Sequence, residues 1–238
     1  MSRPARLEVP SAPGYPARRI FAALLAVSTV MVLTALFEPW WSVPHDLRVF
    51  LDVSNEISLP TWWSTSLLVL AGVLMLTAAG VVPGRSERTA WRLLGGLLVL
   101  MSLDEASMLH ERLALVGSTW WPDAGLNYMW LLLGVPLAGA VVLFVALTAR
   151  GLPGAARWTV LGAFGTYFLG AVGAELAQEA ILRAEEPGQT RWFARRFLAH
   201  LEEGLEMTGA AMLLVTPLTR LRRPLVAGEP GGGTPPRA

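Results

Sequence analysis

The sequence of 238 residues contains no cysteine. The chain therefore forms no disulfide, and it has neither a thiolate metal ligand nor a thiol nucleophile. A metal ion would have to be held by carboxylates, imidazoles or water. Lysine is absent as well, so all 19 basic residues are Arg, which indicates a compositional bias of the source genome.

Charge is also scarce. Charged residues make up 16% of the chain, against about 25% in soluble domains, and 53% of the residues are hydrophobic. The net charge of +1 does not indicate a nucleic-acid partner, and we expect none. The sequence has no Gly-rich phosphate loop, nucleophile-elbow serine or dinucleotide fingerprint. This composition favours the lipid bilayer as the main partner.

Long apolar runs dominate the chain, and a helix needs about 20 such residues to cross a bilayer. Six runs qualify, although the third, fifth and sixth reach full length only when their acidic residues are included. They lie near residues 19–37, 60–82, 90–115, 125–149, 156–182 and 193–219. We predict an all-α fold, a polytopic bundle of six transmembrane helices over residues 18–223. The flanking residues 1–17 and 224–238 are expected to be disordered cytoplasmic tails.

Arginine placement predicts the orientation, because cytoplasmic segments of membrane proteins are enriched in basic residues. Both tails and the second and fourth connections carry Arg, and a six-span topology puts all four on one side. We therefore expect a multi-pass protein of the bacterial plasma (inner) membrane with both termini cytoplasmic. Three Trp pairs, Trp40-Trp41, Trp62-Trp63 and Trp120-Trp121, map to the opposite boundary. The exception is the fifth connection, which is basic and should pair with Glu185 and Glu186 or with lipid phosphates; its residues are Arg183, Arg191, Arg195 and Arg196.

Three predicted spans carry acidic and histidine residues. They are Asp104, Glu105, His110 and Glu111 in the third, Glu175 and Glu179 in the fifth, and His200, Glu202, Glu203 and Glu206 in the sixth. A rise of about 1.5 Å per residue places all of them in the outer third of a core about 30 Å thick and in the adjoining headgroup layer. Ionisable groups are costly inside a bilayer, so this coincidence predicts a working site.

Helical spacing selects an inner set from these residues. It consists of Asp104, Glu111, Glu175, Glu179, His200, Glu203 and Glu206, with His110 as an additional candidate. Glu105 and Glu202 are expected to point elsewhere. In the fifth span, Gly162, Gly165, Gly170 and Gly173 should allow a neighbouring helix to approach closely.

The donor types favour a divalent metal site between helices, with Zn, Mn or Fe as the metal. Its expected ligands are Asp104, His110, Glu111, Glu175, Glu179, His200 and Glu203. Glu206 would serve as a catalytic general base. The first hypothesis is therefore a metal-dependent membrane enzyme, hydrolytic or redox, acting on a lipid or small molecule at the outer leaflet.

Three other interpretations stay open. Membrane-embedded acids also form ion and proton pathways, so a cation- or proton-coupled transporter is the main alternative. A structural or assembly protein is the second. The acids are also explained if they are only the hydrated ends of three helices. The sequence does not indicate an oligomeric state.

Three stretches resemble a group of uncharacterised bacterial polytopic membrane proteins. They are Asn55-Glu56 with Pro60-Thr61-Trp62-Trp63, Ser102-Leu103-Asp104-Glu105 with His110-Glu111, and Leu201-Glu202-Glu203 with Leu205-Glu206-Met207 and Gly209. The resemblance implies a prokaryotic multi-pass membrane protein and carries no activity. The motifs are also distantly similar to membrane hydrolases with carboxylate–histidine zinc sites, whose paired-His motif is absent from the last span.

Overall fold

The computed structural model describes residues 16–37, 42, 44–55, 57–123, 130–184 and 188–221. The side chains of Glu111 and Thr219 are also outside the described part. Most of both predicted tails, the Trp40-Trp41 pair, and Glu185 and Glu186 fall outside these residues, so the expectations placed on them are not addressed.

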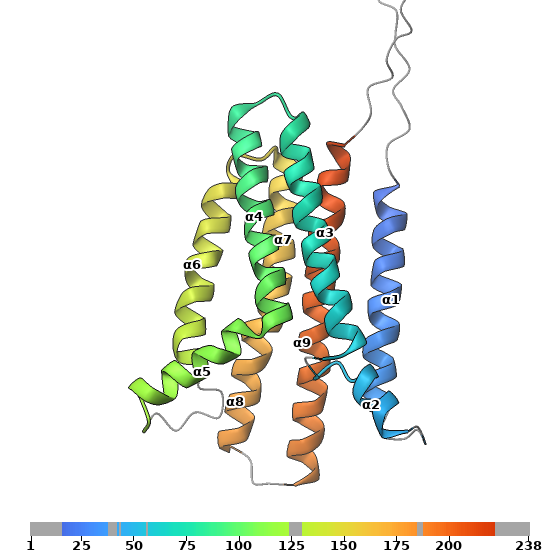
Figure 1. Cartoon of the computed structure of the whole chain (residues 1–238), viewed down its shortest axis with the longest axis vertical. Helices are drawn as coiled ribbons and strands as arrows, with labels where there is room; N and C mark the ends of the chain where they lie inside the picture. Colours follow the sequence, from blue (N-terminus) through green and yellow to red (C-terminus); the bar gives the residue numbers. More distant parts are fainter. Residues whose placement is uncertain are drawn as a thin grey trace, which may run out of the picture.

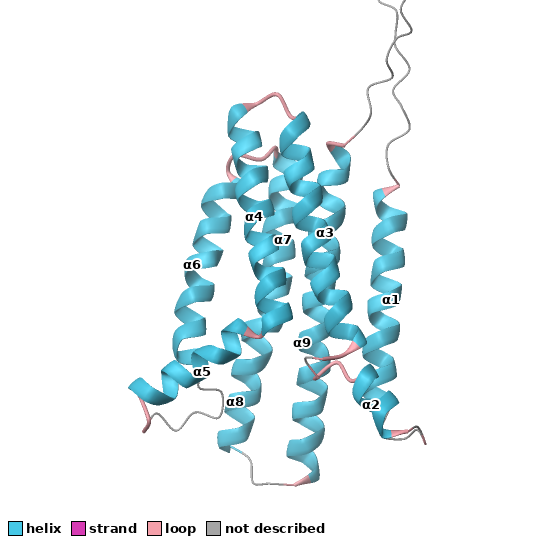
Figure 2. Ribbon diagram, viewed as in Figure 1, coloured by secondary structure: helices cyan, strands magenta, loops and turns pink. Residues whose placement is uncertain are grey.

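Every regular element in the described part of the chain is helical, which confirms the predicted all-α class (Figures 1 and 2). The α-helices are α1 (Ala17–Phe37), α2 (His45–Leu51), α3 (Leu59–Val81), α4 (Arg85–Ser107), α5 (Leu109–Trp120), α6 (Leu131–Ala149), α7 (Gly154–Phe168), α8 (Glu175–Ala184) and α9 (Gln189–Val215). A π-helix, η2 (Leu169–Ala174), joins α7 to α8, and a 3₁₀ turn, η3 (Thr216–Thr219), follows α9.

Judged by length and hydropathy, fewer helices qualify as membrane spans than the six predicted. Four helical stretches are long and apolar enough to cross a membrane: α1, α3, α6 and the run Gly154–Ala184. The pair α4 and α5 makes a fifth if a bent pair counts as one span. Helix α9 has 27 residues, but its acidic and basic side chains keep it from qualifying. Its C-terminal half is nevertheless buried in the bundle, with Met207, Ala210 and Leu213 fully covered.

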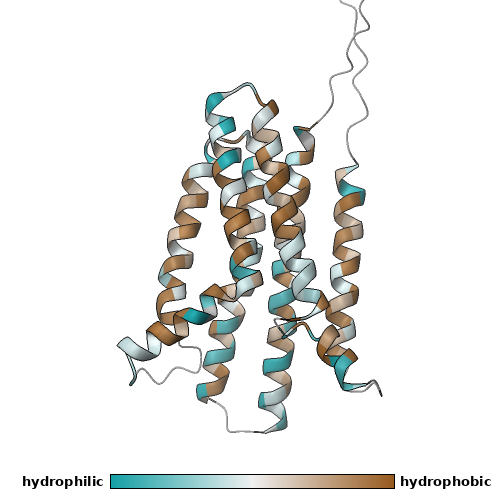
Figure 3. Ribbon diagram, viewed as in Figure 1, coloured by the Kyte–Doolittle hydropathy of each residue, from teal (hydrophilic) through white to brown (hydrophobic). Residues whose placement is uncertain are grey.

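Successive long helices run in opposite directions, as the predicted six-span topology requires (Figure 1). The start of α1, the α3–α4 and α6–α7 connections and the end of α9 lie at the upper end of the bundle in Figure 1. Most of the arginines expected to face the cytoplasm belong to these segments. At the other end, hydrophilic residues extend along the lower halves of α8 and α9, as Figure 3 shows. This hydrophilic stretch of α8 and α9 contrasts with the apolar middle of the bundle (Figure 3).

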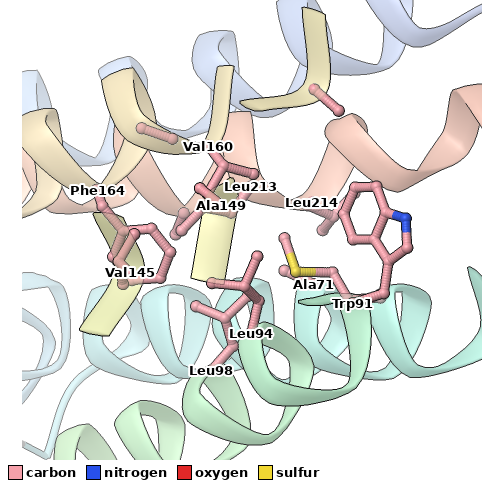
Figure 4. Close-up of a cluster of buried hydrophobic side chains, with 14 of the residues drawn as sticks. Ala71, Trp91, Leu94, Leu98, Val145, Ala149, Val160, Phe164, Leu213 and Leu214 are labelled. Carbon is pink, nitrogen blue, oxygen red and sulfur yellow. The ribbon is translucent and has the colours of Figure 1, made fainter. Parts of the chain in front are cut away.

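An apolar core fills the other half of the bundle. Trp91, Leu94 and Leu98 of α4 are fully buried, and they lie near Val160 of α7 and Leu213 of α9 (Figure 4). Close backbone approach holds α3 against α4. A Cβ atom on Gly72 would lie 2.9 Å from the carbonyl oxygen of Gly95, so glycine is needed there. In a membrane, lipid tails are as apolar as the helix surfaces, so close van der Waals packing of this kind drives helices to associate.

The predicted span over 90–115 is not one continuous helix. Helix α4 ends at Ser107, and Met108 has the left-handed conformation with φ 51° and ψ 42°. The axes of α4 and α5 differ by 79°, so α5 lies across the lower end of the bundle (Figure 1). The backbone N–H of His110 donates to Oδ1 of Asp104 at 2.8 Å. An acidic side chain thus accepts from an N–H that the start of α5 would leave unpaired.

The fifth predicted span is also interrupted. The π-helix η2 changes the angular register between α7 and α8. Within it, a Cβ on Gly170 would lie 2.7 Å from the carbonyl oxygen of Glu202, which confirms the predicted close approach at this position. The same prediction is wrong for Gly165, which has open space around it, and Gly162 has only a distant methionine methyl nearby. The close contact places the start of α8 against the acidic turns of α9.

Candidate functional site

A cavity of about 500 Å³ lies among α4, α5, α6, the end of α7, η2, α8 and α9. Seven ionisable side chains line it: Asp104, Glu105, His110, Glu175, Glu202, Glu203 and Glu206. They come from all three acidic segments of the sequence. The remaining lining is apolar except for Tyr167 and the indole of Trp130. The structure therefore brings the three segments together around one space.

Asp104 and His110 form a fixed pair at the junction of α4 and α5. The ring Nδ1 of His110 lies 3.0 Å from Oδ2 of Asp104, and the other carboxylate oxygen holds the His110 backbone N–H. The imidazole also packs edge-on against Trp130, with 5.3 Å between ring centroids. When Nδ1–H donates to Asp104, Nε2 is the ring atom available to a ligand.

Glu105 and Glu202 line the cavity, so the expectation that they point elsewhere is wrong. Glu105 accepts hydrogen bonds from the Ser64 hydroxyl at 2.8 Å and from the Tyr167 hydroxyl at 3.4 Å. Glu202 accepts from Nε2 of Gln178 at 2.9 Å. The expectation assumed straight, unbroken helices and a narrow inner face. The cavity instead lies between α9 and the distant α6, so a wider arc of α4 and α9 faces inward.

Two residues of the predicted inner set lie outside the cavity. Glu179 is buried, and its Oε1 accepts from Nε of Arg183 at 2.7 Å. His200 is 2% exposed, and its Nδ1 lies 2.7 Å from the carbonyl oxygen of Arg196 one turn earlier. For Glu111, the described part of the structure includes the backbone only. The cavity therefore contains Asp104, His110, Glu175, Glu203 and Glu206 from the predicted set.

The charge of the lining is strongly one-sided. Six of the seven ionisable groups are carboxylates, and the cavity lining includes no Arg. Glu206, the most covered of them, is 7% exposed. Carboxylates that share a space of low polarity repel one another much more strongly than in water. Bound protons or a bound cation would lower this repulsion.

The expected metal centre is not assembled in the described part of the chain. There, no group of three or more His, Asp or Glu side chains is placed to hold a metal ion. The cavity is also far larger than an ion with ligands at about 2.0–2.6 Å requires. A metal cofactor is therefore still a proposal.

Sequence reasoning missed Trp130 and Tyr167. Trp130 is 8% exposed, lines the cavity, and its indole N–H has no hydrogen-bond partner among the described residues. A Cβ on Gly134 would lie 1.9 Å from Cζ3 of Trp130, so glycine makes room for this ring. The available signal was a Trp four residues before a Gly at the start of an apolar helix, outside the three Trp pairs.

Comparison with known proteins gives a family without an activity. A family model described as Domain of unknown function (DUF8692) matches residues 18–221. No curated protein and no solved structure matches the chain.

Proposed function

The chain belongs to the DUF8692 family, whose description names no activity, and we propose that it is a multi-pass membrane protein that binds a cation in exchange for protons. The observation that carries this proposal is the set of six carboxylates facing one cavity whose lining includes no Arg. Protons neutralise these groups when the cavity holds no cation. A bound cation replaces some of those protons.

The Asp104–His110 pair gives the cavity a second kind of proton carrier. The imidazole can bind and release a proton, and the hydrogen bond to Asp104 fixes its orientation. Because protons and the cation compete for the same carboxylates, binding should weaken as the pH falls. This direction follows from the charge of the lining alone.

The proposal places the cavity in the outer half of a bacterial plasma membrane. The arginines at the start of α4 and around the α6–α7 connection lie at the opposite end of the bundle and favour the cytoplasmic side. Both termini would then be cytoplasmic. Buried apolar residues such as Trp91, Leu98 and Phe164 fill the bundle on the cytoplasmic side of the cavity. A transport cycle would require these helices to rearrange.

Proton release tests the proposal. The full-length protein in nanodiscs of zwitterionic lipid, in weak buffer, is titrated with Mn²⁺ and with tetramethylammonium while a pH indicator is followed. We expect a saturable release of protons with at least one of them. Glu175→Gln should reduce this release, whereas Glu179→Gln, on the same helix but outside the cavity, should retain it. If neither cation releases protons from the wild-type protein, the proposal is wrong.

A metal-dependent membrane enzyme is the second candidate, and the Asp104–His110 pair favours it. Histidines that bind metals usually donate their other ring N–H to a carboxylate, as His110 can here. Glu175 and Glu203 could complete a site with Zn, Mn or Fe, leaving Glu206 as a general base. Elemental analysis of the purified protein tests this candidate. Stoichiometric metal that is lost in His110→Ala would support it, and metal-free protein after growth with all three metals would contradict it.

A further inference from the structure

We infer that the cavity binds an amphiphile with an ammonium head group, which enters from the outer leaflet between α4 and α6. This inference rests on the proposed function and names its ligand class. It is carried by the apolar half of the cavity, its lipid-facing side, its volume and the aromatic ring of Trp130 in its lining.

The two walls of the cavity differ in chemistry. Helices α8 and α9 supply only carboxylates to the lining, whereas α6 supplies only apolar residues, all of them after its first turn. These are Gly134, Leu137, Ala138 and Val141, which form one stripe of the helix at intervals of three and four residues. From Trp130 to Val141 this stripe is about 16 Å long. An ion alone would leave this wall without a partner, whereas a ligand with an apolar body would cover it.

The cavity reaches the lipid-facing surface through apolar residues. Leu100 of α4, Leu109 of α5 and Leu137 of α6 all line the cavity, and they are 63%, 45% and 55% exposed. The deepest carboxylate, Glu206, is nearly covered. A molecule that approaches along the bilayer therefore meets leucine first and carboxylate last. This order matches the partitioning of an amphiphile in the membrane.

The volume indicates a ligand larger than an ion. Pockets for drug-sized molecules measure about 300–1,000 Å³, and this cavity of about 500 Å³ lies within that range. A head group near α9 and a short alkyl or ring system against α6 would together occupy both walls.

Trp130 favours ammonium as the head group. Its ring lies beside His110 at the end of the cavity formed by α5 and α6. Aromatic faces attract ammonium groups, and carboxylates neutralise them, so both features select the same charge. An anionic head group would meet six carboxylates and no Arg in this cavity.

A series of four compounds separates charge from chain length. Dodecyltrimethylammonium, tetramethylammonium, dodecyl sulfate and the neutral octaethylene glycol dodecyl ether are added to protein in zwitterionic nanodiscs, and proton release is measured against empty nanodiscs. We expect half-maximal release by dodecyltrimethylammonium at a concentration at least tenfold lower than by tetramethylammonium. The sulfate and the neutral ether should release no protons.

Two substitutions on α6 test the apolar wall. Leu137→Trp should weaken the effect of dodecyltrimethylammonium at least fivefold and leave tetramethylammonium unchanged. Leu143→Trp is the matched control, because Leu143 is 60% exposed on the same helix and does not line the cavity. Equal half-maximal concentrations for the two ammonium compounds, or equal effects of the two substitutions, would overturn this inference. Proton release by Mn²⁺ or tetramethylammonium would still support the proposed function, and its absence with every cation would contradict both.

Discussion

Asp104 connects local structure to the site, because its two oxygens have different partners. Oδ1 accepts the N–H at the start of α5, and Oδ2 holds the imidazole of His110. The side chain therefore stabilises the first turn of α5 and also orients the His110 ring in the cavity. Replacing it separates these two effects.

Asp104→Asn should keep the hydrogen bond from the His110 N–H, since an amide oxygen also accepts, while weakening the pairing with the His110 ring. Asp104→Ala should lose both hydrogen bonds and destabilise the protein by about 1–3 kcal/mol, because the His110 N–H is left without its partner. Thermal unfolding followed by circular dichroism in nanodiscs measures the difference. Equal unfolding midpoints for the wild type and Asp104→Ala would show that this hydrogen bond does not stabilise the start of α5.

Gly134 is the second residue whose role can be isolated. A methyl group there would overlap the ring of Trp130, so Gly134→Ala should displace the indole and weaken ammonium binding at least threefold. Gly139→Ala is the control on the same helix, because a Cβ at Gly139 meets open space. Isothermal titration with dodecyltrimethylammonium gives both affinities. Unchanged binding in Gly134→Ala would show that the position of the Trp130 ring does not affect ammonium binding.

At the scale of elements, the main departures from the prediction are two interruptions of the predicted helices, one at Met108 and one in η2. The sequence predicted six apolar segments near their observed places because length and hydropathy are local properties. It predicted neither the left-handed Met108 nor the π-helix η2, since both depend on contacts with other helices. Glu105 and Glu202 were excluded from the inner set, and His200 and Glu179 were included, because helical spacing alone does not show which arc of each helix lines the cavity. Residue counting predicted that the three acidic segments lie at one level of the bundle, where they do meet around one cavity, but it did not predict their angular positions.

The contact between η2 and α9 can be tested with a pair of glycines. Gly170→Ala places a Cβ against the backbone of Glu202, which should cost about 1–3 kcal/mol and separate Glu175 from the acids of α9. Gly165→Ala, in open space on α7, should be neutral or slightly stabilising. Urea or thermal unfolding compares the two variants. Similar unfolding midpoints for both would contradict the close approach.

For the whole molecule, the absence of cysteine allows a direct test of orientation. Single cysteines at Ser118, near the end of α5, and at Ser86, at the start of α4, mark opposite ends of the bundle, and both side chains are exposed. In intact cells without an outer membrane, an impermeant maleimide should label Ser118→Cys and should label Ser86→Cys only after lysis. The reverse pattern would place the cavity on the cytoplasmic side.

The central claim is that carboxyl groups from separate helices hold protons in one cavity and release them to a cation. Infrared difference spectroscopy of the protein in nanodiscs, before and after dodecyltrimethylammonium, observes these groups directly. The account predicts loss of the protonated carboxyl band with a gain of carboxylate, and a smaller change in Glu206→Gln. A spectrum without carboxyl changes, from protein shown to bind the compound, would contradict it.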